Sequence, residues 1–240
     1  MTASPSLPEI EFLYEQGPVM VVNKPAGLLT QAPPEIDSME LRLKRFLKIR
    51  ENKPGNVYLG VPHRLDRPVS GAMVFAKHVR ATRGLSEQFE YRAVQKKYWA
   101  ITEGRPPEPS GEWMDYMRKI PGKAQSEIVD EQHPHARLAI LKYRCIQEFK
   151  SPHSLLEITL ETGRTHQIRL QCSSRNLPIV GDFQYQATSN FGEPQPDERK
   201  RQIALHARFL KFQHPMTREL LSHIAPLSGP WNQYPITIDS

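Results

Sequence analysis

The chain has 240 residues, of which 38% are hydrophobic and 24% charged, a composition typical of one folded domain. No apolar run approaches the ~18 residues that a membrane-spanning helix needs. The 32 basic and 26 acidic residues leave a net charge of +6, which favours a polyanionic partner without specifying one. The first residues show no secretory signal, and two cysteines are too few for a disulfide framework. We therefore expect a cytoplasmic protein, a monomer, with free thiols and no membrane association.

The first half of the chain predicts both strands and helices. Asp37 or Ser38 can cap a helix whose apolar face carries Met39, Leu43, Phe46 and Leu47. The opposite, basic face of this helix is either a solvated surface or a phosphate contact. Further elements are expected as strands at 20–25, 74–76 and 97–101 and as a helix at 79–92.

The second half is richer in strands and in proline-containing loops. Residues 103–111 predict a loop, and residues 113–135 are too polar to assign. Strands are expected at 138–141, 155–160, 203–206 and 208–212, and a helix at 166–174.

The order of these elements predicts an α+β fold with a mixed or mostly antiparallel sheet, because no regular strand–helix–strand alternation is present. We expect a single domain over residues 1–240. Residues 1–9 are expected to be a flexible N-terminus. Residues 186–202, rich in proline, asparagine and charge, are expected to be a mobile surface loop.

The stretch from His63 to Gly71 places one carboxylate, Asp66, between two arginines and a histidine. Nearby cations favour the ionised form of a carboxylate, which suits a nucleophile or a base better than a general acid. The alternative is structural, with Asp66 capping or bracing the loop through an ion pair.

A second stretch, residues 162–170, reads Thr-Gly-Arg-Thr-His-Gln-Ile-Arg-Leu. If a helix begins near His166, then His166, Arg169 and Ser173 share one face, and Arg164 lies in the preceding turn. Backbone N–H groups and arginines at a helix start favour an anion or a carboxylate. The alternative is a surface helix with an ordinary polar face.

Nucleotide, hydrolase and metal motifs are absent from the sequence. There is no G-x-G-x-x-G, no G-x-x-x-x-G-K-[ST] and no G-x-S-x-G. His133 and His135 lie two residues apart beside a proline, which suits a zinc site poorly. We expect no metal and no cofactor.

Six segments together resemble the RluA-type pseudouridine synthases, and they occur in that family's order between about residues 10 and 227. Departures from the family pattern are Val69 in place of threonine, Leu170-Gln171-Cys172 in place of Val-His-Leu, and Gln186 in place of glycine. We expect no S4-like RNA-binding domain, which many relatives carry at the N-terminus. The segments are 22–27, 63–71, 97–100, 163–169, 178–182 and 205–215.

This resemblance implies an isomerase that converts uridine within ribosomal or transfer RNA into pseudouridine, on a central, bent, mostly antiparallel sheet flanked by helices. It implies an active-site cleft across that sheet, with Asp66 as the catalytic carboxylate and Arg169 as its partner. Asp66 either attacks the sugar or deprotonates it. Tyr98 is implied to stack on the flipped base, with proton handling or packing as open alternatives.

The resemblance also implies a set of substrate-binding residues. Arg64 is expected to enter the RNA and fill the space that the flipped uridine leaves. Ile168 and Leu170 are candidates for the pocket wall, with ordinary core packing as the alternative. His63 either contacts substrate or braces the loop. The remaining expected substrate contacts are Arg164, Thr165 and His166.

Two other classes of function compete with this interpretation. A catalytically silent RNA-binding protein with the same fold would need the same basic surface, but it would not need Asp66, Tyr98 and Arg169. A glycosidase usually requires two cooperating carboxylates. The signature loop offers one carboxylate among cations, so a glycosidase fits the sequence poorly.

Overall fold

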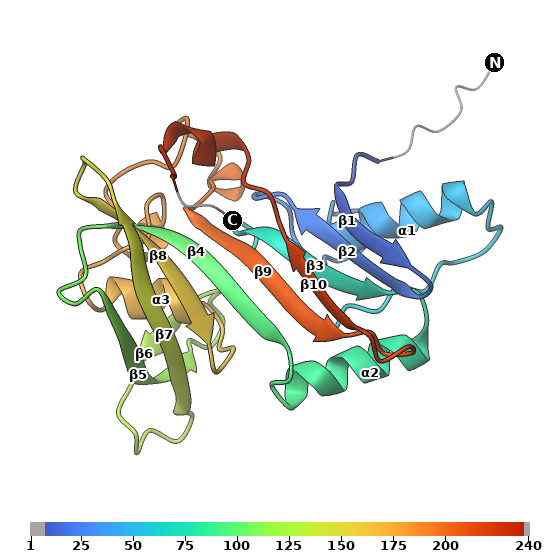
Figure 1. Ribbon diagram of the computed structural model, residues 1–240, viewed down its shortest axis with the longest axis horizontal. Helices are drawn as coiled ribbons and strands as arrows, with labels where there is room; N and C mark the ends of the chain where they lie inside the picture. The colour runs from blue at the N-terminus through green and yellow to red at the C-terminus, as the bar shows by residue number, and fades with distance from the viewer. Residues whose placement is uncertain (1–7, 238–240) are drawn as a thin grey trace.

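The computed structural model describes residues 8–237, which form one continuous ten-stranded sheet with three α-helices (Figure 1). The path of strands in the sheet is β1-β2-β3-β9-β4-β8-β7-β5-β6, and β10 pairs with β9. The strands are β1 (Phe12–Gln16), β2 (Val19–Lys24), β3 (Ser70–Ala76), β4 (Gln95–Glu103), β5 (Ser110–Lys119), β6 (Ser126–Ile128), β7 (Arg137–Glu148), β8 (His153–Leu160), β9 (Leu205–Gln213) and β10 (Leu220–Ile224). The segment 1–9, expected to be flexible, lies almost entirely outside the described residues.

Within residues 8–237, β3 and β9 pair in parallel, and the other paired strands run antiparallel. The α+β class and the mixed, mostly antiparallel sheet expected from the sequence are confirmed. Residues 113–135, too polar to assign, contain most of β5 and all of β6. Only Trp113 and Met117 of β5 are buried, so this strand near the sheet edge lacks a clear alternation of apolar and polar residues.

Two of the three α-helices in the described residues begin at side-chain caps, one of which the sequence predicts. Ser38 accepts a hydrogen bond from the backbone N–H of Leu41 and starts α1 (Met39–Arg50). His78 caps α2 (Val79–Glu90) in the same way. The third helix, α3 (Gln167–Ser173), follows His166, and three short 3₁₀ turns are η1 (Phe183–Tyr185), η2 (Glu198–Lys200) and η3 (Gly229–Gln233). No helix in residues 8–237 has the length and apolarity to cross a membrane.

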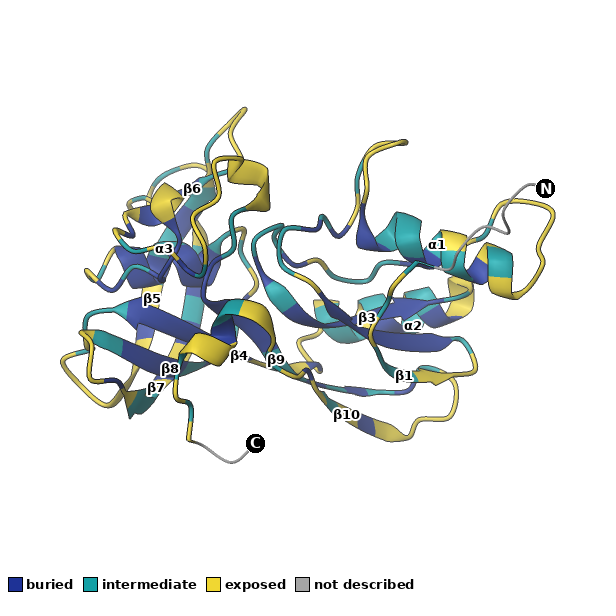
Figure 2. Cartoon of the chain, turned by 90° about the horizontal axis from the view of Figure 1, so that it is seen from above, coloured by how far each residue is buried: buried dark blue, intermediate teal, exposed yellow. Residues whose placement is uncertain are grey.

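The sheet divides the molecule into two lobes (Figures 1 and 2). The first lobe contains β1 to β3, α1 and α2, and the second contains β5 to β8 and α3. The strands β4 and β9 run between the lobes and are mostly buried.

A short parallel joint connects β3 to β9, where Ser70 pairs with His206 and Gly71 pairs with Ala207. The hydroxyl of Ser70 hydrogen bonds with Nδ1 of His206 at 2.8 Å. Gly71 has φ +123°, and a Cβ there would lie 2.5 Å from the backbone nitrogen of Ala207. Glycine at position 71 therefore allows the two backbones to approach this closely.

The segment 186–202 is attached to the core and is not wholly a surface insertion. Ala187 and Phe191 are buried, and Phe191 packs edge-on against Trp231 of η3. The N–H of Gly181 donates to the carbonyl of Ser189 at 2.9 Å. The first part of this segment is therefore anchored to the core by Phe191 and by a backbone hydrogen bond, and the expected mobility of the segment stays a prediction.

We predict that Gly71→Ala destabilises the protein by at least about 2 kcal/mol, because the new Cβ meets the backbone of β9 and the residue must keep a positive φ. Urea unfolding measures the change. The matched control is Gly55→Ala, where a Cβ meets no atom within 4 Å, and its effect should be small. Equal stability of the Gly71 variant and wild type would contradict the described joint.

Candidate active site

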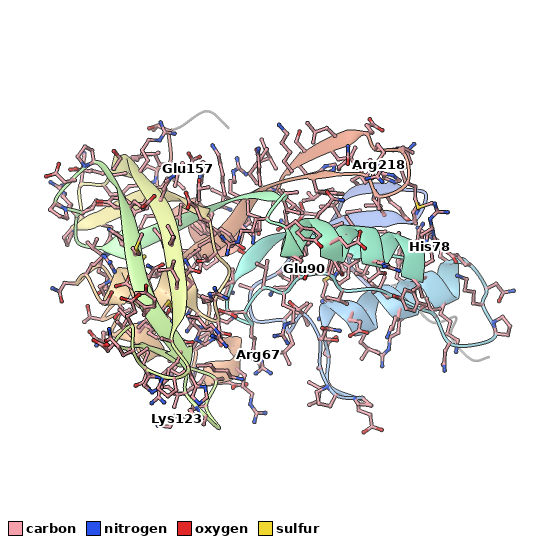
Figure 3. The ribbon with its side chains drawn as sticks, turned by 90° about the horizontal axis from the view of Figure 1, so that it is seen from below. Arg67, His78, Glu90, Lys123, Glu157 and Arg218 are labelled. Carbon is pink, nitrogen blue, oxygen red and sulfur yellow. The ribbon has the colours of Figure 1, made fainter. Side chains whose placement is uncertain are left out.

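Asp66 lies on the loop that leads into β3, at the wall of a cleft of about 1670 Å³ between the two lobes. Two hydrogen bonds with Thr30 fix this loop. The Oγ1 atom of Thr30 donates to the carbonyl of Leu65 at 2.9 Å and accepts from the N–H of Leu65 at 3.2 Å. The side chain of Asp66 is 34% exposed, so it is accessible from the cleft. Figure 3 labels two other residues that line this cleft, Arg67 and Glu90.

Arg169 of α3 joins Asp66 to a second carboxylate, Asp182. Its Nε and Nη2 atoms donate to the two oxygens of Asp182 at 2.6 and 2.7 Å, and Nη2 also donates to Gln184 at 2.8 Å. Its Nη1 atom lies 3.5 Å from Oδ2 of Asp66. Burial disfavours the charge of Arg169, but the hydrogen bonds and charge of Asp182 outweigh burial and raise its pKa. The expected pairing of Asp66 with Arg169 is present in the structure.

His166 approaches the same carboxylate from the start of α3. Its backbone is in the left-handed region, with φ 55°, and its Nε2 atom lies 3.6 Å from Oδ2 of Asp66. The other ring nitrogen, Nδ1, is 2.9 Å from the hydroxyl of Tyr185. Burial lowers the pKa of His166 although Asp66 opposes this effect, so the imidazole is mainly neutral at pH 7.

Tyr98 lies on β4 at an irregularity in the pairing with β9, where the register shifts between Lys97 and Tyr98. The ring is 8% exposed and lines the cleft. Burial, and then the charge of Asp66, raise the pKa of Tyr98, so its phenol remains neutral. A neutral aromatic ring at the wall of the cleft can stack on a planar ligand.

Lys24, for which the sequence left loop support or a phosphate contact as alternatives, is bound to the backbone of loops next to the site. It is fully buried at the end of β2, and its Nζ donates to the carbonyls of Pro25 at 2.8 Å, Leu28 at 2.7 Å and Arg67 at 3.4 Å. Burial lowers the pKa of Lys24 to about 7, against the opposing charge of Asp66. In the sequence, the position of Lys24 in the segment 22–27 is the evidence for a supporting role. Its three backbone acceptors lie in two loops that only the fold brings together.

His63 is packed as a brace for the loop. Its Nε2 atom accepts the N–H of Val74 at 3.1 Å, and its ring stacks on Phe89 at 4.4 Å. Burial, with a smaller contribution from Lys96, lowers the pKa of His63 to about 3. Because the imidazole must stay neutral to accept this hydrogen bond, the structure favours the alternative in which His63 braces the loop.

The other expected binding residues differ in their access to the cleft. Arg64 is exposed and lines the cleft, and it has no hydrogen bond or ion pair with any described residue. Arg164 lines the cleft while its Nε donates to the carbonyl of Leu138, and Thr165 and Ile168 also line it. Leu170 does not line the cleft, so the expectation that it forms part of the pocket wall is wrong. Two residues along a helix turn the side chain by about 200° from the direction of Ile168.

Basic side chains dominate the charged wall of the cleft. Such a lining attracts a polyanion, and cations spaced along it can follow a phosphate backbone. The basic lining residues besides Arg169 are Arg64, Arg67, Arg92, Lys96, Lys97, Arg164, Arg199 and Arg201.

Comparison with known proteins identifies the family that this geometry indicates. The family model for RNA pseudouridylate synthase matches residues 18–174. Ribosomal large subunit pseudouridine synthase D of Xanthomonas campestris is 35% identical over 94% of this chain and 68% of its own length. The tRNA pseudouridine synthase C of Haemophilus ducreyi is 32% identical over 93% of each chain. The chain belongs to the RNA pseudouridylate synthase family, and its relatives show that it is of the RluA type.

The fold comparison agrees with this assignment. The solved structure of Human RNA Pseudouridylate Synthase Domain Containing 4 is 26% identical, with a TM-score of 0.73 over 91% of this chain and 88% of that one. Other curated relatives are longer, and the chain spans 55–70% of their length. Enzymes of this family are isomerases that convert uridine in RNA to pseudouridine.

We predict that Asp182→Asn destabilises the protein by about 3–5 kcal/mol, because it leaves the buried Arg169 without its charged partner. Urea unfolding at neutral pH measures this loss. The control is Asp37→Asn, which breaks an exposed ion pair with Arg42 and should cost no more than about 1 kcal/mol. Similar losses in both variants would show that Asp182 is not a buried anchor.

A second prediction concerns pH. The folded pKa of His63 lies below its unfolded value, so the unfolded chain binds more protons between pH 6.5 and about 3. Stability should therefore fall as the pH is lowered through this range. His63→Gln keeps an acceptor for Val74 but cannot titrate, and its stability should depend less on pH, by up to about 1.4 kcal/mol per pH unit. Parallel pH profiles for the two proteins would contradict the buried neutral imidazole.

Proposed function

We propose that the protein is an active RNA pseudouridine synthase that isomerises specific uridines in ribosomal or transfer RNA. The observation that carries the proposal is the position of Asp66, accessible from a basic cleft and 3.5 Å from an arginine that Asp182 holds in place. Such an arginine can orient a carboxylate through its charge without binding it tightly.

The proposed reaction breaks the bond between N1 of uracil and C1′ of the ribose, rotates the base and joins C5 to C1′. The proton on C5 is lost and N1 gains one, so the product is an isomer. Asp66 either attacks C1′ and forms a covalent intermediate, or removes the C2′ proton so that a glycal forms. Both routes require an ionised Asp66 next to Arg169. The neutral ring of Tyr98 stacks on the uracil while it turns.

Base flipping is the second part of the proposal. A stacked uridine cannot reach a carboxylate inside the cleft, and extruding it costs a few kcal/mol. Stacking on an aromatic ring offsets about 1–3 kcal/mol of this cost. Arg64, exposed and unpaired within residues 8–237, can enter the RNA in place of the extruded base.

The names of two relatives support two classes of RNA as substrates. The Xanthomonas campestris relative is named for the large ribosomal subunit and the Haemophilus ducreyi relative for tRNA, so both substrates are candidates. We infer that the protein acts on one of these RNAs in the cytoplasm, as a monomer.

Release of tritium from RNA labelled at C5 of uridine tests the reaction, because C5 loses its hydrogen only when the new carbon–carbon bond forms. We expect release with wild type from ribosomal or transfer RNA. Asp66→Asn should lower the rate at least about 1000-fold while RNA affinity stays near that of wild type. Asp37→Asn, at a residue that does not line the cleft, should keep full activity.

Two outcomes would contradict this proposal. Undiminished release by the Asp66 variant would remove Asp66 from the reaction. Absence of release by wild type from both RNAs, with binding intact, would favour the catalytically silent RNA-binding protein.

A further inference from the structure

The 3₁₀ turn η1 places the ring of Phe183 at the edge of two cavities, while its neighbours Asp182 and Gln184 contact Arg169. Asp182 and Gln184, on either side of Phe183, both accept hydrogen bonds from Arg169. Gln184 also donates to the carbonyl of Ala124 at 2.9 Å, and Tyr185 contacts His166. The ring of Phe183 is 40% exposed although its backbone is fixed on both sides. Part of this aromatic surface is therefore open to a ligand.

A second cavity of about 300 Å³ adjoins the catalytic cleft at this ring. Phe183 and Arg201 line both spaces. The guanidinium of Arg201 lies 5.6 Å from the centre of the Phe183 ring, and its Nε donates to the carbonyl of Gln195 at 3.1 Å. An ion pair with Glu198 at 3.1 Å also restrains Arg201. The boundary between the two spaces is therefore formed by an aromatic ring and a positioned cation.

The wall of the second cavity carries groups that match the edges of a nucleobase. Amide side chains offer both donors and acceptors, and a carboxylate accepts from an exocyclic amino group. The carboxylate of Glu193 also disfavours a phosphate in this space. The volume is at the lower limit for a ligand site and has room for one planar base. The polar lining residues besides Arg201 are Asn190, Glu193, Gln195, Gln202 and Gln233.

We propose that this cavity binds the unpaired base of a nucleotide adjacent to the target uridine, stacked on Phe183. The inference rests on the proposed function, since it requires RNA in the catalytic cleft. Because η1 links Phe183 to the residues that hold Arg169, the neighbouring base is bound by the same turn that supports the catalytic arginine. The cavity would thus contribute to the choice of uridine by reading the nucleotide beside it.

Fluorescence anisotropy with short single-stranded RNAs tests the proposal without turnover. The intact RNA contains one uridine, and two others lack only the base on its 5′ or its 3′ side. Wild type should bind one of these abasic RNAs more weakly than the intact RNA, by roughly 5- to 150-fold, the loss expected for one base–aromatic stack. Phe183→Ala should bind the intact RNA as weakly as wild type binds that abasic RNA, and should no longer distinguish the two.

Matched variants separate stacking from general packing. Phe183→Trp keeps an aromatic face and should retain the discrimination, whereas Phe183→Leu keeps apolar area and should lose it. Tyr58→Ala removes a similarly exposed aromatic, 45% exposed, that lines neither cavity, and it should leave binding unchanged.

The proposal is overturned if wild type does not distinguish intact from abasic RNA at either position. It is also overturned if Phe183→Ala weakens intact and abasic RNA equally, since the ring would then only support η1. Tritium release by wild type is measured in parallel. Its absence would count against the proposed function, while the anisotropy results would still report on the cavity.

Discussion

The site depends on one buried guanidinium shared between two carboxylates. Arg169 contacts Asp182 at 2.6 Å but Asp66 at only 3.5 Å, so one ion pair is tight and buried while the other is looser and open to the cleft. A buried cation without a partner is costly, and Asp182 removes this cost before any substrate arrives. Asp66 therefore receives the field of a positive charge without being immobilised by it, which suits the reaction that we propose for this carboxylate.

The groups around this pair are arranged so that few further charges compete with it. His166, His63 and Lys24 all have a pKa that burial lowers, and each makes its contacts through ring nitrogens or to backbone carbonyls. The phenol of Tyr98 stays neutral for the same physical reason. The positive charges that would meet RNA lie instead toward the edges of the cleft, on exposed residues such as Arg64 and Arg199. Substrate attraction and active-site electrostatics are thereby separated in space.

The sequence predicted the parts of this arrangement that are local, and missed those that depend on tertiary packing. The resemblance predicted the pairing of Asp66 with Arg169, and the fold class followed from the order of elements. The role of Asp182 was not predicted, because a carboxylate thirteen residues from Arg169 becomes its partner only through the turn at η1. The strand β5 was missed because it lies near the sheet edge and buries few side chains. Leu170 was misplaced because its direction depends on where α3 begins.

The joint between Gly71 and Ala207 fixes how closely the backbone of β3 approaches that of β9. Asp66 belongs to the first lobe and Arg169 to the second, and β3 begins four residues after Asp66. The two backbones meet at this joint without a side chain between them, so main-chain contact sets the spacing between the first lobe and β9 here. Substitutions of core side chains away from this joint can therefore accumulate while the position of the Asp66 loop relative to β9 is preserved.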